Sequence, residues 1–312
     1  MEGAPRTRPP AGAKARAGLA LAACTLAVAG VLVATDGTRF PGVPPPTVAL
    51  APAVAESAAA AAVECAVAGA YRIPERGNVG VPDGVALCSS GPRTLRVAGT
   101  VLDGWEVHGG IVVEAPDVVI RRSRVIGDGT MPFGIRTTGA GSVRIEDVTL
   151  TGDFPEAAIA GDHWSGERLE ISGVSHDGAR LGDSSRLRNS SVRDVATAPD
   201  GRSSALVVHG TGPDVLVEDN TVVVGTGPGR GSAVLLSPEE PVERAEGAVV
   251  IRGNVLGGGR YTLRQDEPAV LCDVRITGNR FRRDAAEAPL RVSRRAVLED
   301  NRYVDGGRLP DL

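Results

Sequence analysis

Short stretches in which alternate residues are apolar, each running into an asparagine position, recur along most of this 312-residue chain. In the clearest copy, DVLVEDNTVVVG at 214–225, the apolar residues Val215 and Val217 precede Asn220. Alternation with a period of two predicts strands that bury one face. Further copies begin at Ala248, Asp273 and Ala296, and weaker ones at Asp117, Ser142, Glu167 and Ser185.

The copies repeat at intervals that vary but stay short. When they are aligned on the apolar residue three positions before the asparagine, neighbouring copies lie 16 to 34 residues apart. Repeats of this length predict a solenoid, because one unit can bury its apolar face only by stacking on its neighbours. The aligned residues are Ile120, Ile145, Ile171, Leu187, Val217, Ile251, Ile276 and Leu298.

Each repeat also contains a second short β-rich segment and leaves no room for a ten-residue helix. Two strands per turn predict an all-β fold, a single-stranded, right-handed parallel β-helix of about nine coils. A leucine-rich repeat has a similar motif, but here valine dominates, and a left-handed β-helix would need strict hexapeptides. The second strands are expected at 110–114, 134–138, 158–162, 178–182, 205–209, 233–237, 261–265 and 289–293.

Composition and charge agree with this fold and narrow the partners. Aromatic residues make up 3% of the chain, which also holds 41 glycines and 22 prolines, as thin β-branched layers and many turns require. The net charge is −4, and no basic stripe is interleaved with aromatic residues. We therefore expect no nucleic-acid partner, and a monomer.

Four segments are predicted along the chain. Residues 1–16 form a basic flank that we expect in the cytoplasm, and residues 17–34 an uncharged apolar helix. This helix spans roughly 27 Å, so it suits either a transmembrane anchor or a cleaved signal peptide. Residues 35–63 form a disordered linker rich in proline and alanine, and residues 64–312 the β-helix. The β-helix is thus expected outside the cytoplasm, anchored to the membrane through 17–34 or secreted.

Cysteine spacing fits an exported protein. Cys65 and Cys88 bracket the start of the domain and predict a disulfide, because a structural metal site needs more ligands than lie nearby. Cys272 remains and is expected to be a buried thiol. The four histidines lack the spacing of metal ligands, so no metal site is predicted.

The positions three residues after the aligned ones should stack along one corner of the coils. Asparagine tolerates a left-handed backbone, and its amides can hydrogen-bond to one another up a stack. We therefore expect this row to be structural. It consists of Ser123, Val148, Val174, Ser190, Asn220, Asn254, Asn279 and Asn301.

A row of polar residues in the second strands offers candidates for binding. Successive coils are about 4.8 Å apart, so residues at equivalent places can share one outward face. Basic groups beside an acid suit an acidic sugar, although the outer face of any solenoid must be polar. His163 and Trp164 come next along the chain, and the Trp164 ring could stack on a sugar. The row consists of Arg136, Asp162, Arg180 and His209.

The longest connections occur on neighbouring coils. One runs through 194–204, directly before the strand that ends at His209, and the other through 237–247. Long insertions on adjacent coils often form the walls of a groove. Asp200, Arg202 and His209 are therefore the candidates for catalysis, and Arg136, Asp162, His163, Trp164 and Arg180 those for substrate binding.

The segment DGWEVHGGIVVEAPDVVIRRSR at 103–124, with the later Asp-Asn and Gly-Asn copies, resembles bacterial right-handed parallel β-helix proteins of the pectate-lyase-like superfamily. The resemblance covers about residues 78–304. Over this range the chain is similar to exported proteins of the actinobacterial type. It implies an extracytoplasmic protein that binds or cleaves a polysaccharide.

Two activities are common among proteins of that kind. Lyases abstract a proton from a uronic acid and use Ca²⁺ to neutralise its carboxylate, whereas glycoside hydrolases use two or three carboxylates. Many relatives carry His-x-Asp-Gly where this chain has Arg202, Ser204 and Ala205, and three acids do not cluster on adjacent coils. Two hypotheses therefore stay open. The protein binds or cleaves an acidic polysaccharide, with Ca²⁺ needed only by a lyase, or it is a non-catalytic surface scaffold.

Overall fold

The computed structural model describes residues 73–75, 77–196, 203–209, 214–226, 231–237, 247–266 and 273–310. Every regular element in these residues is a β-strand, and nothing in this part of the chain forms a helix suited to crossing a bilayer. The predicted apolar helix and linker lie outside the described residues, as do Cys65 and Cys272.

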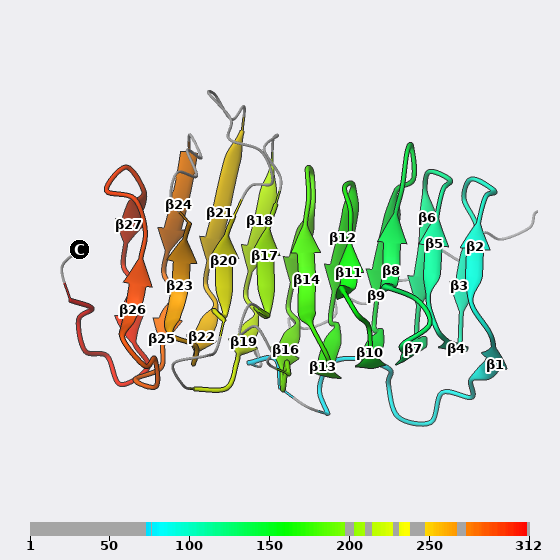
Figure 1. The fold of residues 1–312 in the computed structure, drawn as a ribbon, viewed down its shortest axis with the longest axis horizontal. Helices are drawn as coiled ribbons and strands as arrows, with labels where there is room; N and C mark the ends of the chain where they lie inside the picture. The colour runs from blue at the N-terminus through cyan, green and yellow to red at the C-terminus, as the bar shows by residue number, and fades with distance from the viewer. Residues whose placement is uncertain are drawn as a thin grey trace, which may run out of the picture. The chain divides into compact units, whose positions relative to one another are not determined.

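The strands form three parallel sheets, and each coil contributes one strand to every sheet (Figure 1). The first sheet is made of β1 (Cys88–Ser90), β4 (Trp105–His108), β7 (Arg124–Asp128), β10 (Thr149–Asp153), β13 (Glu170–Val174), β16 (Ser191–Arg193), β19 (Thr221–Val223), β22 (Val255–Gly257), β25 (Arg280–Phe281) and β28 (Arg302–Tyr303).

The other two sheets have nine strands each. The second sheet is made of β2 (Arg93–Leu95), β5 (Ile111–Val113), β8 (Phe133–Thr137), β11 (Ala157–Ala160), β14 (Asp177–Leu181), β17 (Leu206–Val208), β20 (Val234–Leu236), β23 (Tyr261–Gln265) and β26 (Ala288–Arg291). The third is made of β3 (Val101–Asp103), β6 (Val118–Arg121), β9 (Val143–Glu146), β12 (Trp164–Glu167), β15 (Arg186–Arg188), β18 (Val215–Glu218), β21 (Ala248–Arg252), β24 (Asp273–Thr277) and β27 (Val297–Glu299).

Nine coils of three strands, followed by β28, confirm the predicted parallel β-helix of about nine coils. The prediction of two strands per coil was wrong, because the first sheet was overlooked. Its strands directly follow the asparagine corner and are short. In β19, for example, only Val222 points inward, between the half-buried Thr221 and Val223. One apolar residue is too little alternation to predict a strand.

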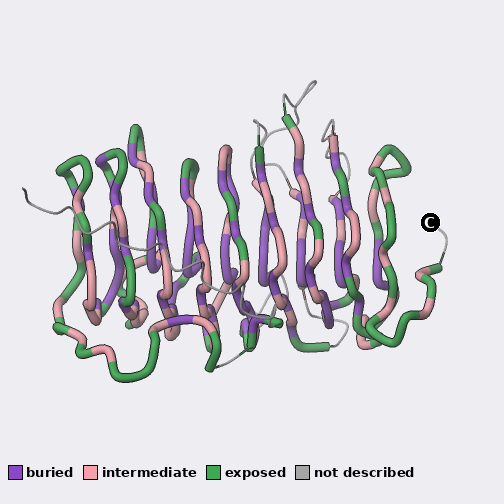
Figure 2. The backbone as a smooth tube through the Cα atoms, turned by 180° about the vertical axis from the view of Figure 1, so that it is seen from behind, coloured by how far each residue is buried: buried purple, intermediate pink, exposed green. Residues whose placement is uncertain are grey.

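The predicted alignment of the repeats holds for most coils. Ile120 pairs with Ile145, and Val217 pairs with Ile251 on the neighbouring coil. Side chains at these positions point inward and are fully buried. Figure 2 shows that such buried residues recur in strand after strand along the stack. The core is therefore a set of thin aliphatic layers, one per coil.

One copy was misaligned by five residues. Ile171 lies in the first sheet, and the third-sheet residue that pairs with both Ile145 and Leu187 is Gly166. A Cβ atom on Gly166 would lie 2.6 Å from Cδ1 of Leu169, which fills the space instead. Leu169, not Val174, consequently occupies this coil's place in the asparagine row.

The asparagine row is built as predicted. The Nδ2 atom of Asn220 donates to Oδ1 of Asn254 at 3.0 Å, Asn254 donates to Asn279 at 2.9 Å, and Asn279 to Asn301 at 3.0 Å. Each Oδ1 also accepts the backbone N–H of the preceding asparagine, at 2.9 to 3.1 Å. The first three side chains are at most 1% exposed. These bonds satisfy backbone groups where the chain turns and the sheets are interrupted.

The residue before each member of this row makes the turn. Asp219 and Asp300 have φ angles of 55° and 53°, and Gly253 and Gly278 have 68° and 65°. Aspartate, asparagine and glycine are the residues that best tolerate this left-handed conformation. One such residue per coil turns the chain sharply from the third sheet into the first.

An N-terminal strap, residues 73–75 and 77–87, crosses the outer face of the first sheet before the chain enters β1 (Figure 1, cyan). The N–H of Gly80 donates to the carbonyl of Arg168 at 2.8 Å, and that of Val81 to Oγ1 of Thr149 at 3.0 Å. Gly80 has a φ of 83°, and a Cβ atom there would lie 2.5 Å from Oγ1 of Thr149. The strap therefore lies tight against the sheet.

Cys88, at the end of the strap, is exposed and free. Its predicted partner Cys65 lies outside the described residues, so the disulfide stays a prediction.

Candidate functional site

The predicted binding residues Arg136 and Arg180 lie on the outer face of the second sheet. Arg136 pairs in register with Ala160, and Arg180 pairs with Val207. Because Ile159 pairs with Ala179, Ala160 is also opposite Arg180. The two arginines thus belong to one outward row, two coils or about 10 Å apart.

An aromatic ring that sequence reasoning missed lies beside both arginines. The Cζ atom of Arg136 lies 4.6 Å from the centroid of the Phe133 ring, and that of Arg180 lies 6.0 Å away. Phe133 begins β8 and is half-buried. Guanidinium groups at these distances are attracted to the face of a ring. Phe133 therefore helps to orient the two cations on the surface.

Arg180 is neutralised by two acids. Its Nη1 lies 2.7 Å from Oε2 of Glu156, and its Nε lies 2.8 Å from Oδ2 of Asp177. Burial works to lower the pKa of Arg180, but the hydrogen bond and charge of Asp177, with those of Glu156, raise it above its ordinary value. Asp177 also accepts the N–H of Ser204 at 2.8 Å. Arg180 is therefore a fixed structural cation.

Arg136 differs from Arg180 in this respect. It is exposed, and among the described residues no carboxylate forms an ion pair with it. Its guanidinium is held by the Phe133 ring and keeps its hydrogen-bond donors available to a ligand.

Asp162 and His163 do not belong to the arginine row. The second strand ends at Ala160, and the two residues form the corner that leads to the third sheet. Oδ1 of Asp162 accepts the N–H of Asp183 at 2.8 Å, and His163 has a φ of 55° and donates its N–H to the carbonyl of Asp183. Sequence reasoning extended β11 by two residues, to Asp162, and so placed Asp162 on its outer face.

Trp164 cannot stack on a sugar at the surface. Its side chain is 1% exposed and packs in the core, because it starts β12 in the inward phase and pairs with the buried Val143. The prediction of a surface platform was wrong for this residue.

Of the three catalytic candidates, only His209 lies among the described residues. His209 directly follows β17, is half-buried, and donates its N–H to the carbonyl of Leu181 at 2.9 Å. Val207 takes the place next to Arg180, so His209 lies at the corner rather than in the arginine row. Asp200 and Arg202 lie outside the described residues, and their roles stay predictions.

A second arginine-on-ring pair lies near the other end of the second sheet. The Cζ atom of the exposed Arg291 lies 5.4 Å from the centroid of the Tyr261 ring, and none of the described carboxylates forms an ion pair with it. The Tyr261 hydroxyl and Arg260 both donate to Glu287, and these bonds lower the pKa of that carboxyl. The acid is thus already engaged, and Arg291 stays available.

Arg264 was also missed. In the strand expected at 261–265, Leu263 is the middle residue, as Arg136 and Arg180 are in theirs, and would face outward with them, but it is fully buried and pairs with Val234. Arg264 lies outward instead, 2.7 Å from Asp266. Aromatic residues could have pointed to this face. They are scarce in the chain, and two of them, Phe133 and Tyr261, begin strands of the second sheet.

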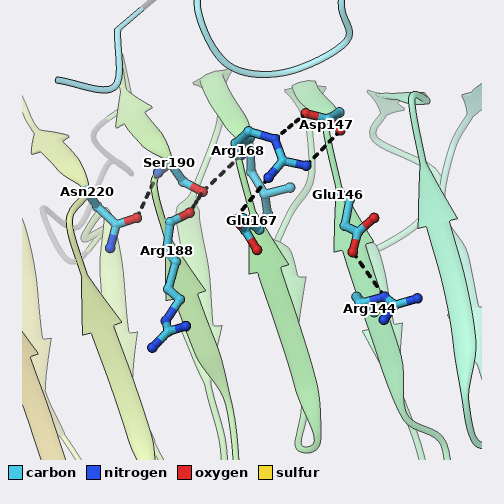
Figure 3. A network of polar contacts seen from close by, with 9 residues as sticks. Arg144, Glu146, Asp147, Glu167, Arg168, Arg188, Ser190 and Asn220 are labelled. Carbon is cyan, nitrogen blue, oxygen red and sulfur yellow. Dashed lines mark hydrogen bonds and ion pairs between the residues drawn. The ribbon is translucent and has the colours of Figure 1, made fainter. Parts of the chain in front are cut away.

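The outer face of the third sheet has a different character (Figure 3). Arg168 bonds to Asp147 at 2.7 Å and to Glu167 at 2.9 Å, and Arg144 bonds to Glu146 at 3.0 Å. Like Arg168–Asp147, the ion pairs Arg121–Asp103, Arg188–Glu218 and Arg252–Glu218 join neighbouring coils, and most of these charges neutralise one another. This face therefore serves to hold the coils together.

Within the described ranges, no three His, Cys, Asp or Glu side chains gather closely enough to hold a metal ion. In comparisons with known proteins, no family model matches the chain, and neither the curated proteins nor the solved structures contain a match.

Proposed function

We propose that the domain binds an extended acidic polysaccharide along the outer face of the second sheet. The observation that carries the proposal is a pair of exposed arginines, Arg136 and Arg291. Each lies over an aromatic ring and forms no ion pair with any described residue. Their strands, β8 and β26, are six steps apart in the sheet, or about 29 Å.

The chemistry of the two positions favours carboxylated sugars. A guanidinium offers a planar fork of donors that matches a carboxylate, and an underlying ring fixes the plane of that fork. Between the two positions the outward row contains Ala160, Val207 and the half-buried Leu235, and also Arg180 and Arg264, whose charges are paired with acids. A row of this length, with an unpaired cation at each end, suits a long chain better than a compact ligand.

We also propose a right-handed coil and membership of the pectate-lyase-like superfamily, supported by the repeat at 103–124 and by the three parallel sheets. An exported location fits such a ligand, with the apolar run at 17–34 as anchor or signal. If the bound chain is also cleaved, Asp200, Arg202 and His209 are the residues to examine for catalysis.

Binding by the full-length protein can be measured by calorimetry with polygalacturonate, alginate and neutral dextran. We expect the acidic chains to bind, with an affinity that falls as salt rises. Arg136→Ala and Arg291→Ala should each weaken binding by about tenfold, because each loses a charge-assisted hydrogen bond. Arg186→Ala, at an exposed site on the third sheet, is the matched control and should change nothing.

Two results would contradict the proposal. One is binding of dextran as tight as that of the acidic chains, and the other is the parent affinity in both variants. New unsaturated or reducing ends in the same mixtures would add cleavage to binding. A protein that neither binds nor cleaves any of the three would favour the scaffold hypothesis.

A further inference from the structure

A cavity of about 610 Å³ lies on the outer face of the first sheet, at the N-terminal strap. Pro74 and Glu75 of the strap line one part of it, and strands β16 and β19 another. The side chain of Asn78 holds this end of the strap, since it accepts the N–H of Glu75 at 2.7 Å and donates to the carbonyl of Ile73 at 2.9 Å. The cavity lies on a different sheet from the arginine row.

Two buried polar atoms in the lining have no hydrogen-bond partner among the described residues. They are Nε of Arg193 and Oγ1 of Thr221. Thr221 pairs in register with Ser191, and Arg193 with Val223, so all four belong to adjacent strands on the same face. Leaving such groups unpaired is costly, which singles the cavity out as a place for a partner.

A glycine on β22 makes room for Arg282, which also lines the cavity. A Cβ atom on Gly257 would lie 2.5 Å from Cδ of Arg282, so the absence of a side chain lets Arg282 lie across β22. Nε of Arg282 lies 2.9 Å from Oδ2 of Asp284, whose Oδ1 accepts the N–H of Gly258 at 2.7 Å. Arg282 and Asp284 both line the cavity and are held in place by these contacts.

The charges of the lining do not favour an acidic ligand. Arg193 is paired with Glu170 at 2.6 Å, and Arg282 with Asp284. Glu75 and Asp194 add two further carboxylates, so the site has no excess of positive charge. Arg193 Nε requires an acceptor, whereas Thr221 Oγ1 can donate or accept. A ligand hydroxyl satisfies both requirements, whereas a ligand carboxylate would be repelled by Glu75 and Asp194.

Apolar surface completes the site. Pro74, Val223 and Val224 supply carbon atoms against which the C–H face of a sugar ring can pack. A volume of this size lies within the usual range for small-molecule sites. We propose that the cavity binds a neutral sugar, of one or two rings, through hydrogen bonds to Thr221 and Arg193. This site is separate from the arginine row and takes an uncharged ligand.

The test uses the full-length protein and ligand-observed NMR titrations with glucose, galactose, mannose and maltose, and with glucuronate as the acidic counterpart. We expect at least one neutral sugar to bind and glucuronate to bind more weakly. Thr221→Val keeps the size of the side chain, removes only the hydroxyl, and should weaken binding about tenfold. The matched control is Thr151→Val, on the same face of the first sheet but outside the cavity, which should leave binding unchanged.

Absence of binding by every neutral sugar at millimolar concentration would overturn the inference, as would equal affinities of the two threonine variants. Preferential binding of glucuronate would overturn it as well. The two sites are distinguished by testing the variant of each site with the ligand of the other. Arg136→Ala should leave neutral-sugar binding intact, and Thr221→Val should leave acidic-polysaccharide binding intact.

Discussion

Replacing Asn254 by alanine tests whether the asparagine row stabilises the fold. Asn254 is fully buried, and its side chain makes five hydrogen bonds within 3.0 Å. Its Oδ1 accepts both the backbone N–H and the Nδ2 of Asn220, while its own Nδ2 donates to Oδ1 of Asn279 and to the carbonyls of Val217 and Arg252.

The size of the effect depends on which hydrogen bonds the partners of Asn254 keep after the substitution. Nδ2 of Asn220 still donates to the carbonyl of Leu187, and Oδ1 of Asn279 still accepts the backbone N–H of residue 254. The backbone N–H of Asn220 is left buried without an acceptor, at a cost of about 1–3 kcal/mol. The carbonyls of Val217 and Arg252 each lose one donor, at about 0.5–1.5 kcal/mol each, so we expect a total loss of about 2–6 kcal/mol.

The assay is urea unfolding of the full-length protein, followed by circular dichroism and by hydrogen exchange with mass spectrometry. Solenoids can lose their coils in steps, so exchange shows where stability is lost. Amides of β18 and β21, next to the corner that Asn254 occupies, should exchange faster. Those of β6 and β9, several coils away, should not change.

Two comparisons make the outcome decisive. Asn301→Ala removes the half-buried last member of the row, where water can replace the bonds, and should cost less than Asn254→Ala. Thr277→Ala, on the outer face of the third sheet, should cost less than about 0.5 kcal/mol. If all three variants unfold at the same urea concentration as the parent, the row does not stabilise the fold and the reasoning fails.

Three further changes test other features of the stack. Burial and the charge of Glu218 raise the pKa of Asp219, so the folded state binds this proton more tightly than the unfolded chain and stability falls as pH rises through that pKa. Asp219→Asn should therefore raise the free energy of unfolding at pH 7 by a few tenths of a kcal/mol, and this gain should vanish below the ordinary aspartate pKa of 3.8. A gain that persists in acid would contradict this cause. Gly166→Val should cost about 1–3 kcal/mol by crowding Leu169, and the double variant with Leu169→Ala should recover part of the loss in thermal unfolding. Glu218→Gln should cost about 1 kcal/mol, since this carboxylate pairs with both Arg188 and Arg252, and equal losses in low and high salt would argue against a charge effect.

The part of the fold that could be predicted is the part in which inward residues are β-branched and closely spaced. Ile145, Val217 and Ile251 sit in strands of four or five residues, so the alternation and the following corner are both visible in the sequence. The first sheet escaped prediction because most of its strands bury a single apolar residue, as Val222 does in β19. Gly166 hid one coil in a similar way, since its neighbour Leu169 supplies the missing volume.

The candidate site was predicted less well, for a reason that lies in the phase of the strands. A shift of one residue moves a side chain from the surface to the core, as Trp164 and Leu263 show. The outward placement of Phe133 and Tyr261 depends on where each strand begins, which the corner geometry decides. The ion pair of Arg180 with Glu156 joins neighbouring coils and could not be read from local spacing.

The asparagine row has a direction. From Asn220 to Asn279, every side-chain amide donates to the following coil, so the bonds can polarise one another along the row. Consecutive members lie 34, 25 and 22 residues apart, which means that coils joined by this row can carry loops of different lengths elsewhere. If the coil that contains Asn254 were duplicated, the new asparagine would accept from the Nδ2 of Asn254 and donate to the Oδ1 of Asn279. The protein can thus grow longer by copying segments of its gene, with each new coil finding its core and its hydrogen bonds already provided.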